Sequence, residues 1–310
     1  MMSPPCARRD PIRRLAAAAD GARVRRMPCP SPCPSPCPSP RPSPLDLPPA
    51  AAQALAGLDP AAASGPWQAL PGGRSNRVWQ VGDLVVKCHD PATATPLFPN
   101  DAGVEAQALA LFGPVGLAPR LRAAGKGWII YDHLTGQIGP GDPAPVAAML
   151  HRLHSLQLPQ SPFRPLPNGS AALLAHARGF APPGLPPPPD DPQIPPVAPC
   201  PVHADAVPGN ILHRQAGPIL LDWQCPGLGD PVEDLATLLS PAMMWLYTGE
   251  KPPDGWATAL LHAYPDRTVA DRTRALLPLY RWRIMAHCAL RAARGDAGYA
   301  TALRIELDTP

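Results

Sequence analysis

Four polar residues between positions 203 and 222 constrain this chain more than any other feature. His203 and Asp205 are separated by one residue, Asn210 follows Asp205 by five positions, and Asp222 stands directly behind the apolar run 218–221. A loop that carries an Asp and an Asn, beside a strand that ends in a second Asp, can bring three oxygen-bearing side chains together. Phosphoryl transfer uses such a set, because one Asp accepts a hydroxyl proton and the other oxygens bind magnesium ions that hold ATP phosphates. We therefore predict a catalytic role for Asp205 and metal binding by Asn210 and Asp222.

The segment 203–210 has a simpler interpretation as a polar turn, because Asp, Pro, Gly and Asn are favoured in turns. Asp222, which stands twelve positions beyond Asn210 and behind an apolar strand, argues against that interpretation. His203 is expected to brace the loop through a hydrogen bond and not to act as the base.

A lysine in a valine-rich strand gives the second prediction. Lys87 ends the run Leu-Val-Val-Lys at 84–87, and burying its ammonium group is costly unless an anion faces it. Glu105, on the helix expected next in the chain, is the natural partner. Such a Lys–Glu pair directs the ammonium group toward the α- and β-phosphates of a nucleotide.

The segment 72–76 (Gly-Gly-Arg-Ser-Asn) lies between two expected strands. Its small residues and backbone N–H groups can cover phosphates, so we predict nucleotide contacts from Gly73, Ser75 and Asn76. A plain hairpin turn is the alternative, since the chain contains neither GxGxxG nor GxxxxGK[ST].

Proline and charge separate an N-terminal tail from the rest of the chain. Many of the 50 prolines fall in two stretches, and the first, 27–44, is a four-residue repeat that favours polyproline II over a packed core. The net charge of residues 1–45 is +6, so the remainder carries −3 of the total of +3. A slightly acidic body gives no reason to expect a nucleic-acid partner. We expect residues 1–50 to be a disordered tail.

Cysteine spacing and hydropathy exclude further classes. The eight cysteines are too scattered for a disulfide framework or a zinc site. No apolar run reaches the ~18 residues of a membrane span, and the segment 15–19 is too short for a signal-peptide core. The expected location is the cytoplasm, without a membrane partner; the oligomeric state is left open.

The element pattern predicts a small sheet followed by helices. Residues 67–90 read as strands joined by a Gly82-Asp83 turn, 101–116 as a helix, and 121–134 as further strands. Helices dominate from 145 onward. The proline-rich part of 164–200 is either a border of the substrate pocket or a surface excursion.

Several segments together resemble the aminoglycoside phosphotransferase and choline kinase superfamily, in its choline and thiamine kinase-like branch, over about residues 66–295. The segments VHADAVPGNIL and LLDWQCPGLGDPVEDLATLL are similar to its catalytic loop and metal-binding segment. The resemblance implies an α+β, two-lobed protein-kinase-like fold, with an N-lobe at 51–133 and a C-lobe at 134–310. It also implies that backbone groups of Asp132 and Leu134 contact adenine at a hinge between the lobes.

Two positions depart from the family pattern. Ala204 replaces a common Gly, and Gln224 stands where Glu is usual after Asp-Trp. Because Asp205, Asn210 and Asp222 are all present, the resemblance implies an active enzyme that uses ATP and Mg²⁺. Asp230 and Asp234 are expected to cap a helix and to anchor the catalytic loop.

The expected acceptor is a hydroxyl group of a small molecule, preferably a choline-, ethanolamine- or thiamine-like alcohol. Aromatic faces with a nearby carboxylate such as Glu233 can bind a cationic headgroup. The aromatic residues considered are Trp245, Tyr247, Trp256, Tyr264, Tyr280 and Trp282; they can equally belong to the core. There are two alternatives. One is a kinase with an aminoglycoside or sugar acceptor, and the other is a nucleotide-binding regulatory protein without turnover.

Overall fold

Alternating residues at 76–89 build the hairpin at the centre of a five-stranded sheet. Strand β2 (Asn76–Val81) pairs antiparallel with β3 (Leu84–His89), with Val81 opposite Leu84. Gly82 between them has a φ of +57°, a left-handed conformation that glycine adopts at no steric cost. The predicted hairpin turn is confirmed.

The computed structural model describes residues 47–70, 75–158 and 160–309, so residues 1–46 of the predicted tail and Gly73 lie outside it.

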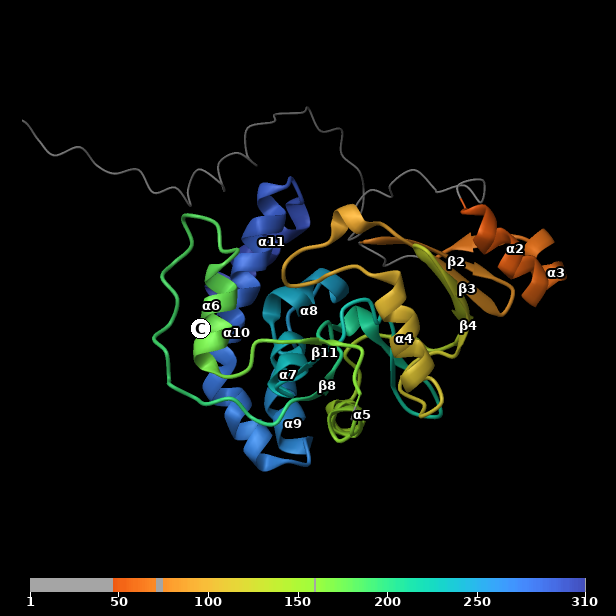
Figure 1. Cartoon of the computed structure of the whole chain (residues 1–310). Helices are drawn as coiled ribbons and strands as arrows, with labels where there is room; N and C mark the ends of the chain where they lie inside the picture. The colour runs from red at the N-terminus through yellow and green to blue at the C-terminus, as the bar shows by residue number, and fades with distance from the viewer. Residues whose placement is uncertain (1–46, 71–74, 159, 310) are drawn as a thin grey trace, which may run out of the picture.

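The sheet is antiparallel in the order β1-β2-β3-β5-β4, and helices pack on both of its faces (Figure 1). Its other strands are β1 (Trp67–Ala69), β4 (Leu121–Gly125) and β5 (Trp128–Asp132). Ile130 packs with residues of α2 (Pro49–Leu58), whereas its neighbour Ile129 packs with residues of α4 (Ala102–Phe112). This alternation follows from the two-residue period of a strand. On β3 the same period puts the Lys87 side chain on the face opposite to that of Val86 and Cys88, which belong to the cluster with α2.

Helix α4 begins where the sequence predicts. The carboxylate of Asp101 accepts hydrogen bonds from the amides of Gly103 (2.8 Å) and Val104 (3.1 Å), which is the N-cap arrangement. Glu105 therefore sits in the first turn of this helix and is 1% exposed.

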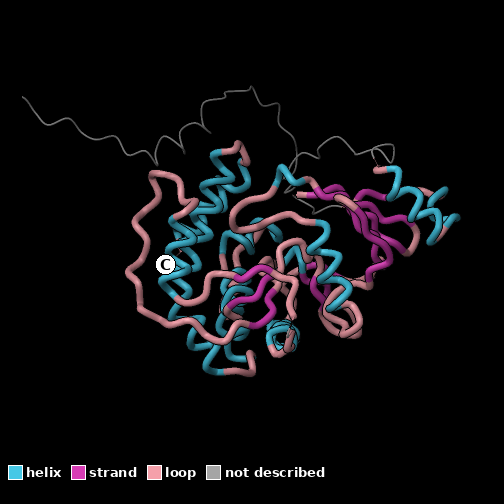
Figure 2. Tube along the Cα trace, in the orientation of Figure 1, coloured by secondary structure: helices cyan, strands magenta, loops and turns pink. Residues whose placement is uncertain are grey.

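The rest of the chain is mostly helical, as predicted, and forms the second lobe (Figure 2). Its α-helices are α5 (Pro143–His154), α6 (Ser170–Arg178), α7 (Val232–Leu238), α8 (Pro241–Thr248), α9 (Trp256–Ala263), α10 (Arg267–Ala293) and α11 (Ala297–Asp308). Two small sheets support the connections between them. One contains β6 (Gln137–Ile138), β9 (Ile211–His213) and β10 (Ile219–Leu220), and the other β7 (Arg164–Pro165), β8 (Cys200–Val202) and β11 (Gly227–Gly229).

The proline-rich segment after α6 runs along the outside of α6 and α10 (Figure 1). Backbone carbonyls of Pro186 and Pro195 accept hydrogen bonds from Trp282 (2.9 Å) and Arg272 (2.8 Å) of α10. Of the two predicted alternatives, the structure shows a surface excursion that is bonded to the helical lobe. Among the described residues, no helix combines the length and the apolarity required to cross a bilayer.

Candidate active site

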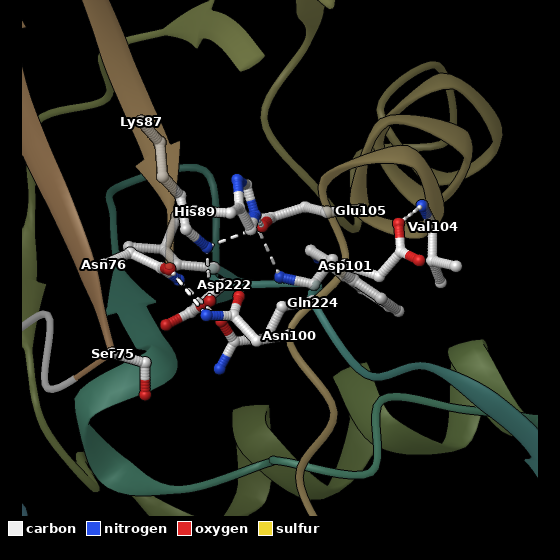
Figure 3. Close-up of polar contacts among 12 residues, drawn as sticks. Ser75, Asn76, Lys87, His89, Asn100, Asp101, Val104, Glu105, Asp222 and Gln224 are labelled. Carbon is white, nitrogen blue, oxygen red and sulfur yellow. Dashed lines mark hydrogen bonds and ion pairs between the residues drawn. The ribbon is translucent and has the colours of Figure 1, made fainter. Parts of the chain in front are cut away.

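Lys87 connects the two lobes at the centre of the candidate site. Its Nζ lies 2.6 Å from Glu105 Oε2 and 2.5 Å from Asp222 Oδ1, as Figure 3 shows. The predicted pair with Glu105 is confirmed, and Asp222 is a second anionic partner. Burial works against the ammonium charge, but the carboxylates of Asp222 and Glu105 raise the pKa of Lys87 above its ordinary value. The lysine is therefore charged at neutral pH although its side chain is 2% exposed.

Both carboxylate oxygens of Glu105 have partners. Oε2 also contacts His89 Nε2 at 2.6 Å, and Oε1 accepts the backbone N–H of Trp223 at 3.2 Å. Although burial opposes ionisation, Lys87 and His89 lower the pKa of Glu105 to about 2. His89 is not among the residues predicted from the sequence, although its position two residues beyond Lys87 places both side chains on the same face of β3.

The predicted catalytic loop, residues 203–210, is held by Asp234 of α7. The two oxygens of this carboxylate accept the amides of His203 (2.9 Å) and Ala204 (2.7 Å), and Oδ2 also contacts His154 Nε2 at 3.0 Å. Ala204 has a φ of +62°, a conformation that an L-residue adopts at some cost. The anchoring role predicted for Asp234 is confirmed. A glycine, which is common at the Ala204 position in the family, adopts a positive φ without that cost.

His203 braces the loop, as predicted. Its Nε2 lies 2.9 Å from the carbonyl oxygen of Leu221, so this nitrogen carries the proton, and Nδ1 accepts the amide of Asp205 at 3.2 Å. Burial lowers the pKa of His203. A neutral imidazole with both nitrogens bonded to backbone connects the catalytic loop to the residue before Asp222. Asp230 stands one residue before the N-cap Pro231 of α7 and accepts the amide of Val232, the first residue of that helix, at 3.1 Å.

Asp205 and Asn210 lie in contact. Asn210 Nδ2 donates to the backbone oxygen of Asp205 at 2.9 Å and to its Oδ2 at 3.2 Å. Burial, and then the charge of Asp222, raise the pKa of Asp205 well above its usual range. Asp222, at 27% side-chain exposure, lines the same pocket as Asp205. The chain thus brings the three predicted oxygen-bearing residues to one region.

The donor set fits magnesium better than a transition metal. Within the described part of the chain, no group of three or more His, Cys, Asp or Glu side chains could hold a metal ion. Magnesium is usually held by one or two carboxylates and takes its other ligands from phosphates and water. The hydrogen bonds that Asn210 makes to Asp205 use Nδ2, so its amide oxygen is the atom that it can offer beside Asp222.

The predicted phosphate-binding residues have different surroundings. Ser75 lines the pocket with Asp205 and Asp222. Asn76 instead joins the lobes: its Nδ2 donates to Gln224 Oε1 at 2.7 Å, and its Oδ1 accepts Asn100 Nδ2 at 2.8 Å (Figure 3). The side chain of Asn76 is thus engaged with protein groups on both sides.

The predicted hinge follows strand β5. The carboxylate of Asp132 pairs with the guanidinium of Arg122, and the amide of His133 donates to the Asp83 carbonyl at 2.9 Å. These bonds hold the start of the link between the lobes. Adenine contacts from the backbone of Asp132 and Leu134 stay a prediction.

The pocket beside Asp205 is walled mainly by the helical lobe. Its lining is Ser75, Thr93, Thr95, Phe98, Asp205, Asp222, Gln224, Met243, Tyr247, His287, Arg291 and Tyr299. Tyr247 packs closely on the catalytic loop, since a Cβ on Gly209 would come within 2.1 Å of its ring. The first and last of these residues, Ser75 and Tyr299, stand 224 positions apart, and no local pattern groups the set.

The residues proposed for cation binding mostly lie elsewhere. Of the six aromatic residues considered, only Tyr247 lines this pocket. Four are buried: Trp256, Tyr264, Tyr280 and Trp282. Glu233 forms a buried ion pair with Arg283. These four aromatic residues therefore belong to the core, which was the alternative to cation binding. The charge of Glu233 is already balanced by Arg283.

A family model of the phosphotransferase enzyme family matches residues 66–276. Among proteins of curated function, none matches the sequence significantly. A choline/ethanolamine kinase family protein from Mesorhizobium loti superposes with a TM-score of 0.59 at 18% identity, covering 84% of this chain and 95% of that one. Choline kinase LicA from Streptococcus pneumoniae gives 0.54 at 14% identity, with 83% and 97% covered. APH(2″)-IIa, in its ternary complex with streptomycin and ATP, gives 0.53 at 13%, with 83% and 99% covered.

At these identities the structural likeness establishes the fold, which is the two-lobed protein-kinase-like α+β fold expected from the sequence. The family match spans both lobes, from the start of the sheet into α10. The chain therefore belongs to the phosphotransferase enzyme family and is a small-molecule kinase.

Proposed function

We propose that this kinase transfers the γ-phosphoryl group of ATP, with Mg²⁺, to a hydroxyl group of a compact alcohol. The observation that carries the proposal is that Asp205 and Asp222 line one pocket while Lys87, held by Glu105, contacts Asp222. In this proposal Asp205 is the proton acceptor and Asp222 the metal-binding carboxylate, and the Lys87 ammonium group lies beside Asp222. Positioning and charge neutralisation are the main contributions that a protein makes to phosphoryl transfer.

Each residue has one role in this proposal. The acceptor oxygen forms a bond to the γ-phosphorus as the bond to the β–γ bridging oxygen breaks, and the hydroxyl proton passes to the Asp205 carboxylate. Lys87 steadies the α- and β-phosphates, and Asp222 and Asn210 hold the metal. Bound magnesium supplies positive charge that offsets the charge of the phosphate oxygens. Ser75 contacts the phosphates, while Asp132 and Leu134 contact adenine.

The acceptor that we propose is an alcohol of about the size of choline, ethanolamine or thiamine. An aminoglycoside carries several ammonium groups and needs several carboxylates to hold them. Asp205 and Asp222 are the two carboxylates in the described lining, and both already have roles in the proposed phosphoryl transfer. The lining thus favours a compact alcohol over an aminoglycoside.

Release of ADP that depends on an added alcohol tests the proposal. We expect the full chain to consume Mg-ATP with a member of a panel of compact alcohols, and ³¹P NMR to show a phosphate ester. Asp205→Ala should lower kcat by at least about 100-fold, since it removes the general base. Asp271→Ala is the matched control, because its carboxylate is 76% exposed on α10. A protein that binds nucleotide but consumes no ATP with any acceptor would instead be a regulatory binding module.

A further inference from the structure

Two nitrogen-bearing side chains of α10 contribute to the wall of the pocket that contains Asp205 and Asp222. His287 and Arg291 both line the pocket, and their four-residue separation places them on one face of the helix. Apart from Asp205 and Asp222, the described lining contains no carboxylate. The lining that an acceptor meets therefore carries the nitrogen groups of these two side chains beside the carboxylates of Asp205 and Asp222.

His287 contributes a buried nitrogen that lacks a partner. The residue is 1% exposed, and its Nε2 has no hydrogen-bond partner within the part of the chain that the structure describes. Its Nδ1 lies 3.4 Å from Thr95 Oγ1, which itself accepts the amide of Phe98 at 3.0 Å. The Thr95 hydroxyl proton has two acceptors within reach, the Phe98 carbonyl oxygen at 3.5 Å and His287 Nδ1 at 3.4 Å; when it is directed to Nδ1, the imidazole N–H lies at Nε2. A buried donor without a partner is costly, so it is a natural site for an acceptor atom of a ligand.

Three arginine side chains act on His287, whose own ring is neutral, and two of them are paired with carboxylates. Burial, and then Arg291, Arg294 and Arg283, lower the pKa of His287 to about 3. Arg283 is paired with buried Glu233, and Arg291 with Asp296 at 3.3 Å. The ring of His287 packs edge-on between the rings of Phe98 and Tyr299, with centroid separations of 4.7 Å and 5.3 Å.

Arg291 retains donors for a ligand. One terminal nitrogen contacts the Thr93 carbonyl at 3.4 Å and the other contacts Asp296. A guanidinium has five N–H donors in a planar fork that matches a carboxylate. Two long bonds therefore fix the side chain without using all of its donors.

A cationic headgroup meets unfavourable surroundings in the same place. The guanidinium of Arg291 already covers Tyr299, 5.0 Å from the ring centroid, and His287 contacts Phe98. Gln224 gives the lining a neutral amide where the family motif usually has a carboxylate. Each of these features removes an attraction for an ammonium group.

We propose that His287 and Arg291 are specificity-determining residues, and that the acceptor is a hydroxy acid whose carboxylate they bind while its hydroxyl group meets Asp205. The inference rests on the proposed kinase function and names the chemistry of its acceptor. It replaces the cationic acceptor expected from the sequence, because four of the six aromatic residues considered there are buried and Glu233 is paired with Arg283.

Matched alcohols and variants test this inference. The panel contains compact hydroxy acids such as glycerate and 4-hydroxybutanoate, neutral 3,3-dimethyl-1-butanol, and choline, with initial rates measured by ADP release. We expect a hydroxy acid to have the highest kcat/KM. Arg291→Gln should lower that value about 10- to 100-fold, mainly through KM, because it removes a charge-assisted bond. His287→Phe keeps the ring contacts and should lower it about tenfold. Arg274→Gln, at a 47% exposed side chain of α10 outside the pocket lining, should leave it unchanged.

The outcomes separate the two proposals. If choline is the best acceptor, or if Arg291→Gln leaves kcat/KM for the hydroxy acid unchanged, the inference is wrong and the kinase function stands. If no alcohol in the panel supports ADP release by protein that binds Mg-ATP, the proposed function fails and the inference fails with it. A normal melting temperature of each variant shows that a loss of rate is not a loss of folding.

Discussion

At the scale of single residues, Lys87 has the most consequential environment. It is a buried cation between two carboxylates, one from each lobe. Removing one member of such a set leaves buried charge without compensation, which costs more than the net value of the ion pair.

Lys87→Met should therefore lower the free energy of unfolding by about 3–5 kcal/mol and weaken ATP binding as well. Urea unfolding followed by circular dichroism measures the first effect. Lys126→Met, at an exposed lysine in the turn between β4 and β5, is the control. A change of less than about 1 kcal/mol for Lys87→Met, the level of an exposed ion pair, would show that Glu105 and Asp222 do not depend on it.

At the scale of elements, the catalytic loop depends on helices that precede and follow it in the chain. Asp234 of α7 binds two loop amides and also His154 of α5. Burial opposes ionisation of Asp234, but these hydrogen bonds, with His154 first, lower its pKa.

Asp234→Asn keeps the size of the side chain but replaces one acceptor oxygen with a donor. One loop amide then loses its partner, at a cost of about 1–3 kcal/mol of stability. We expect kcat to fall about tenfold with little change in KM for ATP, because Asp205 is less well positioned. Steady-state kinetics together with thermal melting would contradict this if the variant retained both wild-type values.

Elements with a local signal were predictable from the sequence. The hairpin at 76–89 follows from alternation and a Gly turn, and α4 follows from its Asp101 cap. The Lys87–Glu105 pair was predictable because the two residues stand 18 positions apart across one strand–helix connection.

Contacts between distant segments were not predictable in the same way. The bonds from Asn76 to Gln224 and from Lys87 to Asp222 join positions 148 and 135 residues apart. They depend on how the lobes meet, which no local period encodes. For the same reason, the sequence did not show that His287 and Arg291 face the pocket while Trp282 on the same helix does not.

At the scale of the whole molecule, buried histidine makes folding dependent on pH. Burial lowers the pKa of His287 to about 3, below the ordinary value near 6.5 that it has when unfolded. Between these values the unfolded chain binds the proton and the folded chain does not. Stability from this group is therefore fully present above about pH 6.5 and is lost as the pH falls toward 3.

Lowering the pH from 7.5 to 5 should cost the wild-type protein about 2 kcal/mol through His287 alone. Urea unfolding at both pH values measures this difference, and His287→Phe should show a difference smaller by that amount. Equal pH dependence in the two proteins would mean that His287 is protonated in the folded state.

The central claim is that Asp205 and Asp222 occupy one pocket with separate tasks, proton acceptance and metal binding. Titration calorimetry of Mg-ATP into wild-type, Asp205→Ala and Asp222→Ala proteins tests it most directly. The account predicts that Asp222→Ala weakens Mg-ATP binding by at least about tenfold, the loss of one charge-assisted contact. Asp205→Ala should keep the wild-type Kd within about threefold, a change of less than ~1 kcal/mol. The reverse order of affinities, or no loss in Asp222→Ala, would contradict it.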